Sequence, residues 1–155
     1  LDESSVSAAE GVTFHLNQAV KHPENPVLLP GEPHQWDSLQ ASWPATVLYS
    51  PSDKKFRCWY AGMDCIQSPQ RRWETGYAES DDGVHWQKPE LGQFTFLDRP
   101  TNRIQTSWDT YLLSLVFENP LPNAPASQRF GGYWIEVDKD EFNWLSWRKA
   151  LAWSP

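Results

Sequence analysis

The chain has 155 residues, a formal net charge of −7 at pH 7 and 14% aromatic residues, including ten tryptophans. Its Lys and Arg residues form no run longer than a pair, so the sequence lacks a basic patch that would bind nucleic acid or an anionic membrane. No apolar stretch approaches the ~20 residues that a membrane-spanning helix requires.

The N-terminal part of the chain predicts little regular structure. Residues 1–20 form a polar tail with one short strand candidate at 12–16. Residues 21–44 begin with KHPENPVLLPGEP, in which four of thirteen positions are proline. Proline neither donates to a strand ladder nor fits a helix interior, so we expect an extended strap that ends in a loop flanked by Trp36-Asp37 and Trp43-Pro44.

Residues 45–97 predict an antiparallel β-meander, because short apolar strand candidates alternate with turn residues. The candidates lie at 45–49, 56–61, 73–79 and 84–87, and 94–97 adds a brief edge strand. An Asp-Asp-Gly turn at 81–83 precedes the fourth candidate. Alternation along the second candidate predicts that Cys58 and Tyr60 share one face and that Trp59 lies on the other.

Residues 98–155 predict a second, weaker copy of this unit. After a polar loop, strand candidates lie at 112–117, 130–137 and 147–153. Pro120 follows Pro51 by 69 positions and Ala152 follows Ala78 by 74, which indicates an internal repeat. The predicted fold is all-β, with about two β-propeller-type antiparallel four-stranded meanders, the second incomplete. We expect the chain to be part of a longer polypeptide, because it stops where the first copy continues into its turn.

The first meander also carries a resemblance to a known family. VLYSPSDKKFRCWYAG followed by GYAESDDGVHWQKPELG resembles the repeat of the five-bladed β-propeller superfamily of arabinanases, invertases and levansucrases, in its largely uncharacterised bacterial branch. The resemblance covers residues 21–155 and is most specific over 44–92. It implies a propeller fold, a carbohydrate-active role, no cofactor, and an extracellular or periplasmic location. SDDGVHW is similar to the Asp-box of sialidase-type propellers, which implies that Asp82 caps backbone amides while Trp86 packs beneath the turn.

The resemblance also implies where carboxylates would act. Enzymes of this superfamily place them at the inner strands, and glycoside hydrolysis uses two carboxyl groups ~5–9.5 Å apart. The superfamily's Asp-Pro at the first inner strand is replaced here by Trp43-Pro44. The catalytic candidates are therefore Asp37 in the preceding loop, Asp109 before the second inner strand, and Glu118 at the end of that strand. No residue stands out as the general acid.

Tryptophans next to these positions are candidates for stacking on sugar rings, namely Trp36, Trp43 and Trp108. The four histidines share no metal-ligand spacing, so no metal site is predicted. Cys58 and Cys65 form either a local disulfide or two unpaired thiols.

Three functions follow from these patterns. In the first, the protein hydrolyses glycosidic bonds of a poly- or oligosaccharide with a carboxylate pair, and another part of the polypeptide or another subunit supplies the missing acid. In the second, it is a non-catalytic carbohydrate-binding module. In the third, it is an assembly unit, in which open sheet edges pair in a homo-oligomer or with the remainder of a longer chain.

Overall fold

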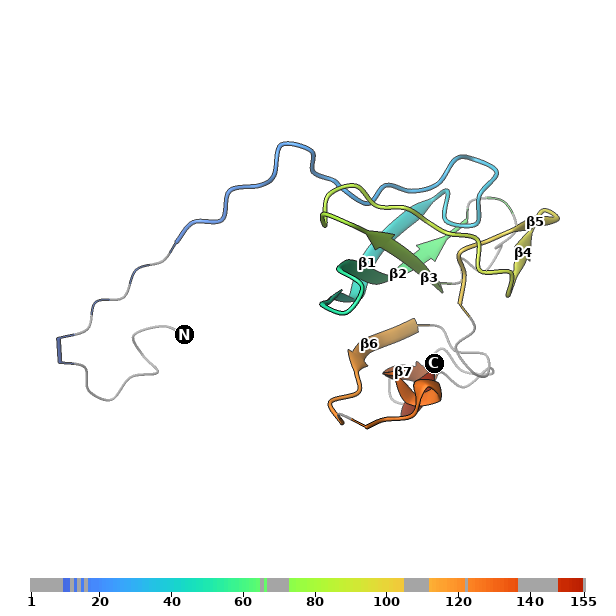
Figure 1. Cartoon of the computed structure of the whole chain (residues 1–155). Coiled ribbons are helices and arrows are strands. Elements are labelled where there is room, and N and C mark those ends of the chain that lie inside the picture. The colour runs from blue at the N-terminus through green and yellow to red at the C-terminus, as the bar shows by residue number, and fades with distance from the viewer. Residues whose placement is uncertain are drawn as a thin grey trace.

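The computed structural model describes residues 10, 11, 13, 15, 17–64, 66, 73–104, 112–121, 123–136 and 148–154. These residues form eight strands in antiparallel sheets and one short 3₁₀ turn, η2 (Ala126–Gln128), without an α-helix (Figure 1). The prediction of an all-β fold is confirmed. None of the described segments is a helix with the length and hydropathy needed to cross a membrane.

The first sheet consists of β1 (Gln40–Ser50), β2 (Lys55–Met63) and β3 (Glu74–Ser80), paired in that order. The predicted alternation along β2 is confirmed. Tyr60 belongs to a core cluster on one face of the sheet, and Trp59 belongs to a second cluster on the other face. Each face of this sheet therefore carries its own apolar layer.

Strand β1 begins earlier than the sequence predicts: it includes Trp43 and Pro44, which the sequence places at the end of the strap, before the first strand. The strand tolerates this proline because its register with β2 shifts on both sides of Pro44, and because β1 is the edge of the sheet. Proline is accepted at edges and irregularities of this kind, where its missing N–H leaves no ladder bond unmade.

The predicted fourth strand at 84–87 is reduced to a single bridge. Gln87 and Glu79 exchange backbone hydrogen bonds of 2.8 and 2.9 Å, and the chain then leaves the sheet. The predicted edge strand at 94–97 is present as β4 (Thr95–Phe96), which pairs with β5 (Arg99–Pro100) in a two-stranded hairpin.

The second sheet repeats the pairing pattern of the first. It consists of β6 (Leu112–Glu118), β7 (Phe130–Glu136) and β8 (Arg148–Ser154). Val47 pairs with Cys58 and Cys58 with Ala78; in the second sheet Val116 pairs with Gly132 and Gly132 with Ala152. The strands of the two sheets thus match at the offsets of 69 and 74 residues that the sequence indicates.

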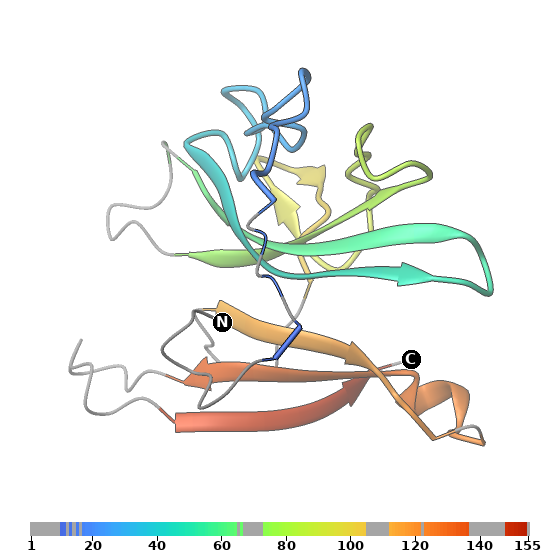
Figure 2. The same cartoon turned by 90° about the vertical axis from the view of Figure 1, so that its left-hand side faces the viewer.

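The two sheets lie face to face, and the first strand of each runs in the same direction (Figure 2). Trp59 and Val116 are the buried centre of the contact, with Leu48, Tyr77, Ile104 and Phe130 packed around them. The backbone N–H of Val116 donates to Thr46 Oγ1 at 2.8 Å. Burying a large apolar side chain contributes ~1.5–3 kcal/mol, so this aromatic contact stabilises the stack.

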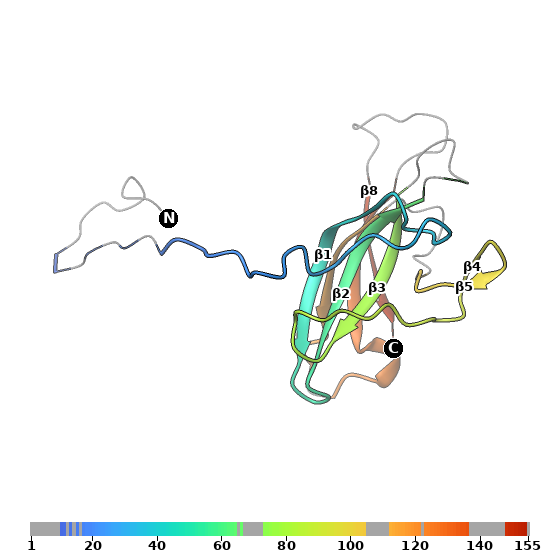
Figure 3. The same cartoon turned by 90° about the horizontal axis from the view of Figure 1, so that it is seen from above.

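The other face of the first sheet is covered by loops rather than by a sheet (Figure 3). Trp36 comes from the turn before β1 and Phe96 from β4 of the β4–β5 hairpin, and both pack with Tyr60, Cys58 and Ala78. Cys58 is a free thiol in this core, and burial raises its pKa to about 11. The disulfide alternative for Cys58 is therefore not realised; Cys65 lies outside the described residues.

Candidate functional site

Asp37 is the centre of the candidate site. It lies in the turn that precedes β1, and only 1% of its surface is exposed. Its Oδ2 accepts hydrogen bonds from the Tyr60 hydroxyl at 2.8 Å and from Lys88 Nζ at 2.5 Å. A buried carboxylate is costly unless it is paired and hydrogen-bonded, and these two donors meet that requirement.

The network continues through Asn102. Its Nδ2 donates to the Tyr60 hydroxyl oxygen and to the Tyr77 carbonyl oxygen, both at 2.7 Å, and its Oδ1 accepts from Trp36 Nε1 at 2.6 Å. Burial, followed by the nearby Asp37 charge, raises the pKa of Tyr60 well above its usual range. Tyr60 therefore stays protonated and acts as a fixed donor to Asp37.

Lys88 joins this network to the N-terminal strap. Its Nζ donates to the Leu29 carbonyl oxygen at 2.7 Å and lies 5.3 Å from the centre of the Tyr60 ring. The side chain is 21% exposed, so the Lys88–Asp37 pair lies at the border between the core and the surface. One ammonium group thus holds the strap, the buried carboxylate and β2 together.

Glycines make room for the aromatic wall behind Asp37. A Cβ atom on Gly62 would lie 2.4 Å from the Trp36 ring, and one on Gly76 would lie 2.6 Å from that ring and 2.7 Å from Tyr60. These positions on β2 and β3 must remain without a side chain for the indole to pack against the sheet. The local sequence therefore fixes Trp36 and, next to it, Asp37.

A pocket of about 180 Å³ opens beside this network. The strap turn, the segment after the Asp-box turn and the β4–β5 hairpin form its walls. Its lining includes His34, Gln35, Trp36, Asp37, Lys88, Glu90, Phe96, Arg99, Pro100, Thr101 and Asn102. Among the described residues, neither Glu90 nor Arg99 has an ion-pair partner, so both charges are available to a bound molecule.

The structure separates two of the predicted catalytic carboxylates. Asp37 lies with Tyr60 on one face of the first sheet, whereas Glu118 belongs to β6, which packs against the other face. Glu118 is exposed and pairs with Arg129 at 3.5 Å. Asp37 and Glu118 therefore lie on opposite faces of the first sheet, and the structure does not bring them together within one chain.

The other predicted site residues have different outcomes. Trp36 is buried, with its indole hydrogen-bonded to Asn102, so it supports the pocket from within the core. Trp43 lies in β1. Asp109 and Trp108 lie outside the described residues, and their predicted roles stay predictions.

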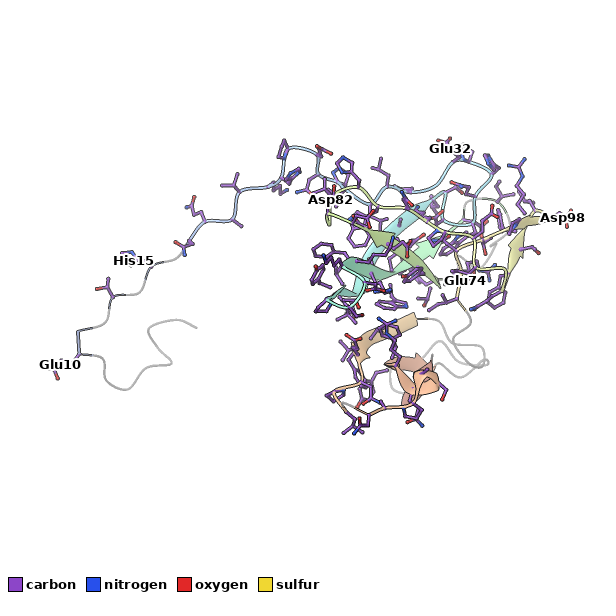
Figure 4. The ribbon with its side chains drawn as sticks, viewed as in Figure 1. Glu10, His15, Glu32, Glu74, Asp82 and Asp98 are labelled. Carbon is purple, nitrogen blue, oxygen red and sulfur yellow. The ribbon has the colours of Figure 1, made fainter. Side chains whose placement is uncertain are left out.

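Figure 4 labels Asp82 in the turn after β3, and the hydrogen bonds of this turn match its Asp-box likeness. Asp82 Oδ1 accepts from the backbone N–H groups of Val84 and His85, each at 2.8 Å, and Trp86 Nε1 donates to the Gly83 carbonyl oxygen. The His85 side chain also lowers the pKa of Asp82 and has its own pKa raised in return.

A second, smaller pocket of about 110 Å³ adjoins this turn, but its charges are used within the protein. Lys55 Nζ pairs with Glu79 at 3.2 Å and with Asp81 at 3.4 Å. In the described part of the chain, no group of three His, Cys, Asp or Glu side chains is arranged to hold a metal ion.

Sequence reasoning identified Asp37 but missed its hydrogen-bond partners Tyr60 and Lys88, and it missed Asn102, which bonds to Tyr60. These three residues lie 23, 51 and 65 positions after Asp37, so no local motif unites them. The only signal was chemical: a lysine directly after the fourth strand candidate and a lone asparagine in a polar loop. No family model, no curated protein and no solved structure matches this chain.

Proposed function

We propose that this chain forms two blades of a β-propeller-type carbohydrate-active protein, and that the pocket beside Asp37 binds one residue of a poly- or oligosaccharide. The observation that carries the proposal is the pocket itself, which gathers carboxylates, cationic donors and apolar surface within about 180 Å³. The two stacked meanders with one pairing pattern support the propeller part. An extracellular or periplasmic location would suit a polymeric substrate.

The lining matches what a sugar ring requires. Each sugar hydroxyl both donates and accepts, so acceptors such as Asp37 and Glu90 must alternate with donors such as Lys88 and Arg99. Phe96 and Pro100 supply apolar surface for the C–H groups of the ring. The volume lies below the ~300–1,000 Å³ typical of drug-sized ligands, which favours a single sugar residue over a larger cofactor.

The network also holds the pocket floor ready for a ligand. Asn102 is fixed by three hydrogen bonds, and Asp37 is fixed by Tyr60 and Lys88. A ligand that binds here orders few additional side chains, and this lowers the entropic cost of binding. A bound sugar would then form new contacts with Glu90 and Arg99 at the rim of the pocket.

The binding test uses oligosaccharides of arabinan and levan, the polymers after which enzymes of the resembling superfamily are named. Binding is measured by calorimetry and by the fluorescence of Trp36 beside the pocket. Glu90→Gln and Arg99→Ala should each weaken binding about tenfold, because a hydrogen bond to a charged group contributes ~1.5 kcal/mol or more. Asp98→Asn, on the same hairpin but outside the pocket lining, should leave affinity unchanged. If all three variants bound the oligosaccharides as tightly as the wild type, the pocket would not be the sugar-binding site.

Hydrolysis is the second candidate function, and one observation favours it: Asp37 and Glu90 line the same pocket. Glu90 would give its proton to the leaving oxygen as the glycosidic bond breaks, and a water would add to the anomeric carbon while its proton passes to the Asp37 carboxylate. Release of new reducing ends from the same oligosaccharides measures this activity. Glu90→Gln should abolish release while some binding remains. Binding without release in the wild type would favour the non-catalytic carbohydrate-binding module.

A further inference from the structure

The outer face of the second sheet is apolar and open to solvent. Leu115 and Tyr133 pair across β6 and β7 and are 45% and 40% exposed. The ring of Phe117 lies 5.8 Å from that of Tyr133 and covers Gly131. Three large apolar side chains therefore form one patch, which we call the outer patch, on the side of the sheet that faces away from β1–β3.

The repeat relates the outer patch to a contact that the molecule already makes. The shared pairing pattern places Leu115 and Tyr133 where the first sheet has Thr46 and Trp59. In the first sheet this face is covered, because Trp59 packs against the second sheet and Thr46 accepts the Val116 N–H. The same face of the repeat is thus an interface in the first sheet and exposed in the second.

The contact between the two sheets also has a second side, and its counterpart is exposed on β1 of the first sheet. In the second sheet, Val116 packs against the first sheet and is only 4% exposed. Its counterpart in the first sheet is Val47, which is 48% exposed. Tyr49 is also exposed, and its ring contacts the tilted ring of Phe56 on the same face, with 4.8 Å between the ring centroids. We call Val47 and Tyr49 the β1 patch.

We propose that a second copy of this chain docks head to tail, with the outer patch of one copy on the β1 patch of the next. Part of each half of this sheet-to-sheet contact is exposed on a single chain: Leu115 and Tyr133 on the second sheet, and Val47 and Tyr49 on β1, beside the loops that cover the rest of that face. A head-to-tail interface is heterologous, so it propagates into a ring if the rotation closes. The proposal rests on the repeat and not on sugar binding, so it stands or fails separately from the proposed function.

The test measures mass in solution by light scattering after size exclusion. The wild type should have at least twice the 17.9 kDa mass of one chain. Leu115→Glu, in the outer patch, and Val47→Glu, in the β1 patch, should each give the mass of a monomer. Leu121→Glu is the matched control, because Leu121 is exposed in the loop after β6 and belongs to neither patch. Far-ultraviolet circular dichroism confirms that each variant retains its strands.

Mixing the two patch variants tests the head-to-tail geometry directly. The Leu115→Glu chain keeps its β1 patch and the Val47→Glu chain keeps its outer patch, so an equal mixture should form a dimer of one of each. A wild type that is monomeric overturns the proposal. So does a multimer whose mass neither substitution changes, or a mixture that stays monomeric, since these results place the contact elsewhere or make it symmetric.

Discussion

Replacing Lys88 with methionine tests whether the network around Asp37 holds the fold. The substitution keeps most of the side-chain volume but removes the charge and both hydrogen bonds, to Asp37 Oδ2 and to the Leu29 carbonyl oxygen. A hydrogen bond to a charged group contributes ~1.5–3 kcal/mol, and loss of the partner leaves a buried carboxylate less well compensated. Because Lys88 is one-fifth exposed, water replaces part of the loss.

The expected decrease in the free energy of unfolding is therefore about 2–4 kcal/mol. Urea unfolding followed by tryptophan fluorescence should show the midpoint lowered by roughly 1–2 M, since slopes for small proteins are ~1–3 kcal/mol per M. Lys21→Met, on the exposed strap, should change the midpoint little. In a double-mutant cycle with Asp37→Asn, the two losses should fall short of additivity. A loss below ~0.5 kcal/mol, as for an ordinary surface change, would refute the reasoning.

Three further predictions concern the first sheet and the turn that follows β3. Gly76→Ala should lower the unfolding free energy by ~1–3 kcal/mol, because the new methyl overlaps the Trp36 ring; thermal melts that match the wild type would contradict this. The pKa of His85 is raised, chiefly by its hydrogen bond to Asp82, so its stabilising charge is present below its ordinary pKa and lost as pH rises through the folded value. Melts from about pH 5 to about pH 9 should show that loss, and His85→Gln should remove it. Cys58 should resist thiol reagents until the protein unfolds, as peptide mapping would reveal, because burial raises its pKa to about 11.

The sequence predicted those features of the fold that depend on neighbouring residues. The alternation at Tyr60 and Trp59 and the Asp-Gly turn at 81–83 depend on side-chain period and turn chemistry, and both are present. The repeat offsets that the sequence indicates are also present in the structure, because equivalent strands of the two sheets pair in the same register. Trp43-Pro44 was misplaced, since a proline signals a loop locally whereas the edge position of β1 tolerates it.

The candidate site was only half predictable for a physical reason. Asp37 was identified because a loop acid before an inner strand matches a family pattern. Its geometry depends on Lys88, which bonds to Asp37, and on Asn102, which bonds to Tyr60, and both reach these positions only after the loops fold back over β2 and β3. Hydrogen bonds between residues so far apart in the chain produce no periodic pattern in the sequence. The same limit applies to Glu118, whose distance from Asp37 depends on which face of the sheet each one occupies.

The consecutive order of strands within each sheet has a consequence for how the chain folds. Every strand pair in the two sheets joins neighbours along the chain, whereas the Thr46–Val116 bond spans 70 residues. Local pairing closes short loops and is fast, while contacts at long separation come later. During synthesis, residues up to Asn102 suffice to complete the first sheet and its loop cover before β6 exists. In pulsed hydrogen exchange we expect the Tyr60 amide to be protected before that of Val116, so that the second sheet forms against a surface already in place.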